Sequence, residues 1–201
     1  MRTFFLFLFL LIGGGAFLLF GPGADEPASV VKKTRAAVGE AGTASIEKAA
    51  DYWLTEAGKQ RAGNNAQASG TALAIAIRLG RLEALQVGVK RVPDRMKRKF
   101  RGHFEEAVLD EARWTVAEPG TRLGRILARW PVKEGAVTLG NVIVFKTESG
   151  SKNRSLFAHE LAHVEQYREL GITEFARRYA ADPEPIEAEA RRKSRRVMRS
   201  L

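Results

Sequence analysis

The sequence contains no cysteine and only three histidines among its 201 residues. The absence of thiols excludes disulfide frameworks and cysteine-ligated metal sites, so a transition metal would have to be bound by imidazole and carboxylate groups. The glycines and prolines follow no fixed period and no stretch repeats, which excludes solenoid and array architectures. A chain of this length accommodates one domain with a buried core and a targeting segment.

The N-terminus carries a long apolar run. Residues Phe4–Phe20 contain no charged side chain, and the Gly-Pro-Gly sequence that follows would end a helix. This run of 17 residues lies at the boundary between a long signal-peptide core and a minimal membrane span of roughly 17 to 25 residues. We therefore predict that residues 1–23 are a signal peptide or a membrane anchor, with the rest of the chain on the periplasmic or extracellular side.

Residues 24–92 are rich in alanine and in charged residues that favour helices. We predict a helical N-terminal region here, with one or two helices before Arg61. The polar sequence GNNAQASG, from Gly63 to Gly70, predicts a loop. The helix expected after this loop has apolar residues at helical spacing, and they predict its buried face: Ala72, Ile75, Leu79, Leu82 and Leu85.

Residues 93–201 combine patterns typical of helices with patterns typical of strands. The sequence AVTLGNVIVF places two β-branched runs on either side of Gly140-Asn141, which predicts a tight hairpin. The other elements expected are a short basic helix opened by Pro93, a strand from Ala112 to Val116, a helix from Thr121 to Trp130, and a polar loop from Glu148 to Asn153. The predicted fold class is α+β and mostly helical, with a small antiparallel sheet or hairpin packed on a later helix.

The last eleven residues, RRKSRRVMRSL, carry six positive charges and no acid, in a chain whose net charge is +10. Such a tail can contact anionic lipid or nucleic acid. A solvated helix face or a frayed terminus explains it as well, and this is the interpretation we favour. We therefore expect a basic C-terminal helix and no specific nucleic-acid partner.

The residues after the polar loop predict a well-delimited helix. Asn153 can cap its start, and Gly171 can adopt a positive φ beyond its end. Within it, the sequence HELAH from His159 to His163 matches the pattern HExxH. Residues four apart on a helix differ by about 40° around the axis and by about 6 Å along it, so both imidazoles can bind one ion. Glu160 borders that ion without binding it and can accept a proton from a zinc-activated water.

A catalytic zinc ion usually has three protein ligands and one open position. The third histidine, His103, lies far upstream beside a phenylalanine, which is more typical of a packing residue. The region PEPIEAEARR offers three downstream carboxylates: Glu184, Glu187 and Glu189. Glu187 shares a helix face with a small alanine and is the ligand we choose, and Glu189 is the alternative. In the competing interpretation Glu189 is a solvated charge paired with Arg192 or Lys193.

Several stretches of the chain resemble a known family. LFAHELAHVEQY, GITEFARRYA and PIEAEA, together with the hairpin AVTLGNVIVF, resemble the gluzincin-like domain of bacterial proteins that includes the core domain associated with extracellular contractile injection systems. The resemblance extends from about Pro93 to Arg192, roughly half of the chain. Residues 1–92 fall outside it.

This resemblance implies a zincin-like half-domain at residues 93–201 in which Glu160 is the general base. It also implies that a strand within Val137–Phe145 pairs with the backbone of an extended substrate. The ligands of Zn²⁺ would be His159, His163 and Glu187. We therefore predict a metallopeptidase that hydrolyses peptide bonds in a protein or peptide substrate. The alternative is a non-catalytic, zinc-stabilised module that assembles or anchors an envelope complex.

Hydrolysis of an amide also needs a group that stabilises the oxyanion. The phenols nearest to the motif in sequence are Tyr167 and Tyr179. Tyr167 follows His163 by one helical turn, and for this residue we favour a role in packing.

Overall fold

The computed structural model describes residue 52, residues 54–129 and residues 135–201. The predicted signal peptide or anchor at residues 1–23, and most of the chain in which helices are expected before Arg61, lie outside these residues. Residue 52 and residues 54–62 are helical. Within the described part of the chain, no helix is both long and apolar enough to cross a membrane. The membrane anchor therefore stays a prediction.

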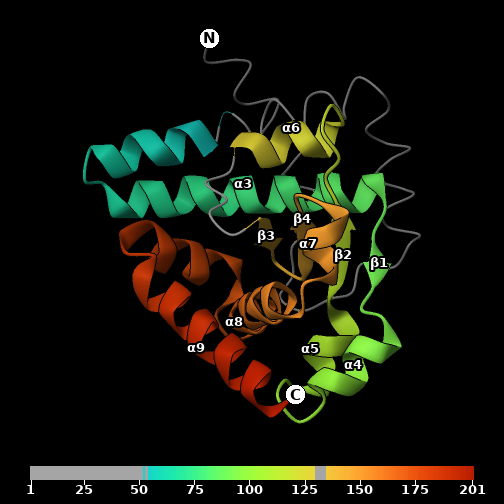
Figure 1. Cartoon of the computed structure of the whole chain (residues 1–201). Coiled ribbons are helices and arrows are strands. Elements are labelled where there is room, and N and C mark those ends of the chain that lie inside the picture. Colours follow the sequence, from blue (N-terminus) through green and yellow to red (C-terminus); the bar gives the residue numbers. More distant parts are fainter. Residues whose placement is uncertain (1–51, 53, 130–134) are drawn as a thin grey trace.

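The described residues form helices around a small sheet (Figure 1), which confirms the mostly helical α+β class. In chain order the elements are α3 (Ala66–Val87), β1 (Lys90–Arg91), α4 (Asp94–Phe100), α5 (Glu106–Glu111), β2 (Arg113–Val116), α6 (Arg122–Arg129), β3 (Ala136–Leu139), β4 (Val142–Phe145), α7 (Glu148–Lys152), α8 (Arg154–Ala181) and α9 (Glu184–Ser200). Helix α8 packs against the hairpin strands, against α3 and against α9. Helix α8 is therefore in contact with most of the other elements of the described fold.

The four strands of the described sheet are arranged in the order β1-β2-β4-β3. Strands β3 and β4 form the predicted hairpin, in which Leu139 pairs with Val142 and Gly140 has a φ of 66°. Strand β1 pairs with β2 in antiparallel orientation, but β2 and β4 run parallel. The sheet is therefore mixed and not purely antiparallel, because the chain crosses over through α6 and β3 before β4 joins β2. Strand β3 lies at one edge of the sheet, beside α8.

Two buried apolar clusters stabilise the fold. The first is rich in aromatic residues: Phe100, Phe104, Trp114, Phe145 and Phe157. The ring of Phe157 has no exposed surface, and its centroid lies 5.2 Å from that of Phe145. The second cluster is mainly aliphatic and joins α3 to the sheet and to the later part of α8 through Ala76, Ile77, Ala84, Leu139, Val142, Tyr167 and Phe175. Helix α8 contributes to both clusters, and Leu161 and Ala162 of the HExxH motif belong to the first.

Helix α3 begins earlier than the sequence predicts. The expected loop from Gly63 to Gly70 ends at Asn65, whose side chain accepts a hydrogen bond from the backbone N–H of Ala68 at 3.1 Å. A Cβ atom at Gly70 would lie 2.8 Å from the Cα of Arg177, so this glycine allows α3 to approach α8 closely. The second half of the predicted loop therefore belongs to α3, where Gly70 lies in the contact with α8.

The buried face of α3 also differs from the predicted one. Ala72 and Leu82 are buried as predicted, but Ile75, Leu79 and Leu85 are only partly buried. Ala76, Ile77 and Ala84, which lie outside the predicted face, are almost fully buried. Small side chains face α8 because the two helices lie close together. Strand β1 follows α3 and pairs with β2 just before the domain boundary predicted at Pro93. That boundary stays a prediction.

The polar sequence predicted as a loop from Glu148 to Asn153 contains the short helix α7. The hydroxyl of Thr147 caps it by accepting a hydrogen bond from the backbone N–H of Gly150 at 3.0 Å. A single capped turn needs little apolar periodicity, which is why the pattern gave no helix signal. The predicted helix opened by Pro93 is confirmed as α4, and Phe100 at its end is fully buried.

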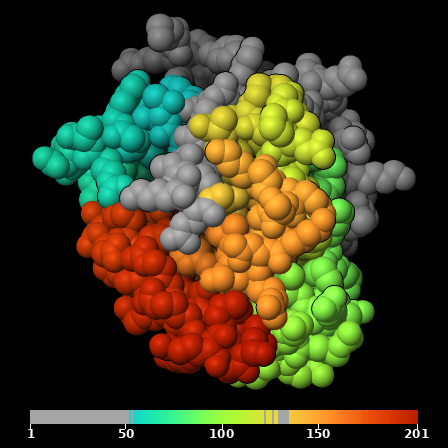
Figure 2. All heavy atoms as spheres, viewed as in Figure 1, coloured from blue at the N-terminus to red at the C-terminus, as the bar shows by residue number. Residues whose placement is uncertain are grey.

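The C-terminal helix α9 is basic, as predicted, and forms a long part of the surface (Figure 2). Its buried face consists of Ile186, Ala190, Ser194 and Val197. Four arginines at helical spacing are exposed on its other side: Arg192, Arg195, Arg196 and Arg199. These four positive charges therefore occupy a solvated helix face, whereas Arg191 and Lys193 are partly buried and pair with Glu184 and Glu165.

Candidate metal centre

The first part of α8 fixes both histidines of the HExxH motif. Asn153 caps the helix, because its side chain accepts hydrogen bonds from the backbone N–H groups of Ser155 at 3.0 Å and Leu156 at 3.2 Å. His159 is 4% exposed and His163 is 6% exposed. Their Nε2 atoms lie 3.1 Å apart, with the two rings almost perpendicular. The helix therefore directs two imidazole nitrogens at one point.

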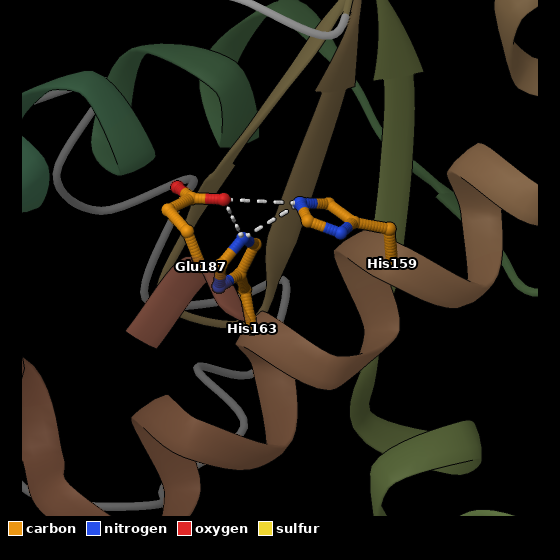
Figure 3. Close-up of side chains that lie close together, drawn as sticks. All are labelled: His159, His163 and Glu187. Carbon is orange, nitrogen blue, oxygen red and sulfur yellow. Dashed lines mark hydrogen bonds and ion pairs between the residues drawn. The ribbon is translucent and has the colours of Figure 1, made fainter. Parts of the chain in front are cut away.

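Helix α9 brings a carboxylate to the same point (Figure 3). The Oε2 atom of Glu187 lies 3.3 Å from His159 Nε2 and 3.6 Å from His163 Nε2. Tetrahedral zinc with bonds of about 2.0–2.2 Å separates its ligand atoms by roughly 3.3–3.6 Å. The three observed separations of 3.1, 3.3 and 3.6 Å are close to that range. The chemistry and spacing of these three donors are therefore compatible with one tetrahedral zinc ion.

A break in α8 allows the chain to return to the site. Gly171 has a φ of 70° and interrupts the helical backbone, as the sequence predicts, so residues 172–181 form a second helical segment. On this segment Phe175 stacks on Tyr167, with ring centroids 3.8 Å apart, and Tyr179 stacks on Phe175. The three stacked rings fix the segment against the first part of α8 and place Tyr179 at the candidate site.

Tyr179 orients the carboxylate of Glu187. Its hydroxyl donates a hydrogen bond to Oε1 of Glu187 at 2.9 Å, which leaves Oε2 facing the two histidines. Tyr167, the other phenol considered, is buried and stacked on Phe175, which agrees with a packing role. Of the two phenols, Tyr179 is therefore the one in contact with a candidate ligand.

Gln166 is a residue of the site that the sequence interpretation missed. One side of its amide lies 2.8 Å from His163 Nδ1, and its Nε2 donates hydrogen bonds to the Ile186 carbonyl at 3.1 Å and to Glu189 Oε2 at 2.9 Å. Its position three residues after His163, on the same side of the helix, is the sequence signal that could have indicated a contact between the two side chains. Polar contacts of this residue thus join α8 to the first turns of α9.

Glu160 points into the fold beside the two histidines. It is 2% exposed, and its Oε2 accepts a hydrogen bond from the hydroxyl of Thr138 on β3 at 2.7 Å. Burial raises the pKa of Glu160, and the neighbouring His163 and the Thr138 hydrogen bond oppose this shift only in part. The carboxylate is therefore fixed in orientation and takes up a proton more readily than an exposed glutamate.

The ligand candidates influence each other's ionisation in the metal-free protein. Burial raises the pKa of Glu187, but the interactions with His159 and His163 outweigh it, so the pKa lies well below its usual range. Burial lowers the pKa of His163, but Glu187 and Glu160 outweigh it, so this pKa lies above its usual value. Glu187 is therefore ionised at neutral pH, as an anionic metal ligand must be.

A cavity of about 410 Å³ opens over these residues. Strand β3 forms one side of it through Ala136, Val137 and Thr138, and apolar side chains from residues 54–62 and α3 form another: Leu54, Ala57, Leu73 and Ile77. Tyr179 and Phe175 line it from the second segment of α8. The volume falls within the range of about 300–1,000 Å³ found for ligand pockets.

The remaining predicted site residues lie elsewhere. Glu189 is exposed and accepts a hydrogen bond from Gln166, so it does not join the two histidines. The predicted ion pair of Glu189 with Lys193 is also absent among the described contacts, because Lys193 pairs with Glu165. His103 lies at the far end of α9, where its Nε2 is 3.0 Å from the hydroxyl of Ser200. It is not a member of the site.

Comparison with known proteins adds one finding. Residues 91–171 match the model of the eCIS core domain, and this stretch contains the HExxH motif, Thr138 and Gln166. The match ends at Gly171, before Tyr179 and Glu187. No curated protein and no solved structure matches the chain. Over residues 91–171, and over this part alone, the chain is similar to the eCIS core domain.

Proposed function

We propose that this protein is a zinc-dependent metallopeptidase of the gluzincin type, in which His159, His163 and Glu187 bind the metal. The observation that carries the proposal is the triangle of donor atoms, with sides of 3.1, 3.3 and 3.6 Å, contributed by three residues that line a cavity. Two imidazoles and one carboxylate are a ligand set typical of catalytic zinc. A zinc ion held by these three residues would supply Lewis acidity.

Glu160 is the general base of the proposed reaction. It adjoins His159 in the chain, lines the cavity and is held by Thr138 at 2.7 Å, so its carboxylate has one orientation. Its raised pKa makes it a better proton acceptor than an ordinary glutamate. In the proposed reaction it accepts a proton from the attacking water and passes it to the nitrogen of the leaving amine.

The proposed substrate is an extended peptide. Among the described strands β3 lies at an edge of the sheet and borders the cavity, so an extended peptide could pair with its backbone. Tyr179 also lines the cavity, and it would stabilise the oxyanion by transferring its hydroxyl hydrogen bond from Glu187 Oε1 to the substrate oxygen. With residues 1–23 as signal peptide or anchor, the reaction would take place at or beyond the membrane.

Replacement of the base tests this function. Full-length protein in detergent should contain about one zinc ion per chain and cleave an unstructured, fluorescently labelled protein. Glu160→Gln should retain the zinc and lose roughly 100- to 10,000-fold in kcat. Glu169→Gln, an exposed carboxylate on the same helix, is the matched control and should cleave as the wild type does. If Glu160→Gln cleaves at the wild-type rate, Glu160 is not the base.

A second candidate function is a zinc-stabilised module without catalysis that assembles or anchors an envelope complex. It is favoured by the position of the metal ligands on two helices, because a bound ion would cross-link α8 to α9. In that case removal of zinc by a chelator lowers Tm, and no cleavage of any peptide library is found with the metal-loaded protein. Zinc-dependent cleavage that is lost in Glu160→Gln would exclude this candidate.

A further inference from the structure

The orientation of the Gln166 amide follows from its neighbours. The side chain is 5% exposed, and one end of the amide faces two groups that can only accept: the Ile186 carbonyl at 3.1 Å and Glu189 Oε2 at 2.9 Å. The NH₂ group must therefore lie at that end. Its oxygen is then the atom that lies 2.8 Å from His163 Nδ1.

This orientation determines which nitrogen of His163 carries the proton. An amide oxygen accepts and cannot donate, so Nδ1 of His163 must be the donor in this contact. In the neutral ring the other nitrogen, Nε2, then has a free lone pair. Nε2 is the atom that faces His159 Nε2 at 3.1 Å and Glu187 Oε2 at 3.6 Å. The ring is thus held in the tautomer that can bind a metal.

The same side chain also places the third ligand. The carbonyl that accepts from Gln166 belongs to Ile186, the residue immediately before Glu187 in the first turn of α9. Because helix backbones are stiff, fixing this carbonyl fixes the position from which the Glu187 side chain starts. An apolar side chain of equal length would fill the same space but leave His163 Nδ1–H and its neighbours on α9 without this partner.

We propose that Gln166 is the positioning residue of the metal site: it holds His163 as the Nδ1–H tautomer and docks the start of α9, so that His163 Nε2 and Glu187 Oε2 converge. The proposal rests on the metal site of the proposed function and not on its peptidase activity. It joins a residue inside the stretch similar to the eCIS core domain to a ligand outside that stretch.

The tautomer can be read without metal or substrate. The chain has only three histidines, so full-length protein labelled with ¹⁵N-histidine in detergent gives a simple long-range ¹H–¹⁵N spectrum, which His103→Asn helps to assign. At an alkaline pH at which the ring is neutral, His163 of the zinc-free wild type should carry its proton on Nδ1, and Gln166→Met should show a mixture of tautomers. A wild-type His163 protonated on Nε2 alone would overturn the proposal.

Zinc affinity supplies the second readout. Competition with a chromophoric chelator should show that Gln166→Met raises the zinc dissociation constant roughly 10- to 100-fold, as for other residues that orient a metal-bound histidine. Ser194→Ala is the matched control, because Ser194 is 4% exposed and donates a hydrogen bond from α9 to the Ser155 carbonyl on α8 at 2.7 Å. It should lower stability but change the zinc dissociation constant less than about threefold.

Gln166→Glu separates the two roles and serves if Gln166→Met does not fold. Its carboxylate can still accept from His163 Nδ1–H, so the Nδ1–H tautomer should persist, while the hydrogen bond to Ile186 is lost and zinc binds more weakly than in the wild type. A folded Gln166→Met or Gln166→Glu that binds zinc like the wild type would refute the proposal. Zinc binding by a wild type that cleaves nothing would refute the peptidase function and leave this proposal standing.

Discussion

Helices α8 and α9 contribute to the same candidate site in opposite ways. The residues of α8 from Phe157 to Val164 are all buried, and the two histidines lie among them. Helix α9 buries one face and exposes an arginine-rich one, and Glu187 lies at the margin, with 22% of its side chain exposed. The α8 ligands are thus related by helix geometry alone, whereas the α9 ligand depends on how the two helices pack.

The same difference appears in the comparison with known proteins. The stretch similar to the eCIS core domain contains the α8 ligands and ends before α9. The packing that brings in Glu187 depends on the break at Gly171, on the stacked rings and on Gln166. We therefore expect changes in α8 to affect the metal site more strongly than changes in α9.

Removal of a ligand from each helix tests this expectation most strongly. His163→Ala should bind no zinc above background, because it leaves no pair of imidazoles on α8. Glu187→Ala keeps that pair, and its zinc dissociation constant should rise about 100-fold, or about 2.8 kcal/mol at 1.4 kcal/mol per factor of ten. Chelator competition measures both. An equal loss of zinc affinity in the two variants would contradict the expectation, because the α9 carboxylate would then be as essential as the α8 histidines.

Core truncation extends the comparison to stability. Phe157→Ala on α8 removes a fully buried ring from the aromatic cluster and should lower the free energy of unfolding by about 3–5 kcal/mol. Val197→Ala on α9 removes less apolar surface and should cost about 1.6 kcal/mol, at roughly 0.8 kcal/mol per methylene. Urea titration of the zinc-free proteins measures both values. A larger loss for Val197→Ala would contradict the role of α8 as the central element.

The smallest effect is expected at the second segment of α8, where Glu174 contacts Arg177 and Arg178. Hydrogen bonds from Arg177 and then Arg178 lower the pKa of Glu174 from 4.5 to about 2. A carboxyl group whose pKa falls on folding stabilises the protein above its unfolded pKa, and this contribution is lost as the pH falls.

Glu174→Gln should therefore be slightly less stable than the wild type at pH 7. The difference should shrink as the pH falls from about 4.5 to about 2 and vanish below that. Thermal unfolding over this pH range measures it, with Glu118→Gln at an exposed position as a control. A difference that stays constant down to pH 2 would show that the effect of Glu174 is not electrostatic.

The sequence predicts best those features whose signal lies within one element. The HExxH spacing, the cap at Asn153, the positive φ of Gly171 and the Gly140 hairpin are all local, and the structure has each of them. The choice of Glu187 over Glu189 used helix periodicity, and Glu187 is the one that lies beside the histidines.

The features that escaped prediction depend on contacts between distant residues. Thr138 and Glu160 are 22 positions apart, and Gln166 meets Ile186 across 20 positions. The predicted start of α3 is wrong because Gly70 indicates a loop in the sequence. In the structure this glycine lies within the helix and allows the close contact with Arg177. A single sequence carries no pattern for such pairs, since neither partner has a spacing that identifies the other.

The most direct test of the account is the metal and its ligands. Zinc analysis of the full-length protein, together with zinc X-ray absorption, should give about one ion per chain with two imidazole nitrogens and one carboxylate oxygen at about 2.0–2.2 Å. Glu187→Ala should lose the carboxylate oxygen from that shell. A protein that binds no zinc, or zinc bound without the two imidazoles of His159 and His163, would contradict the account.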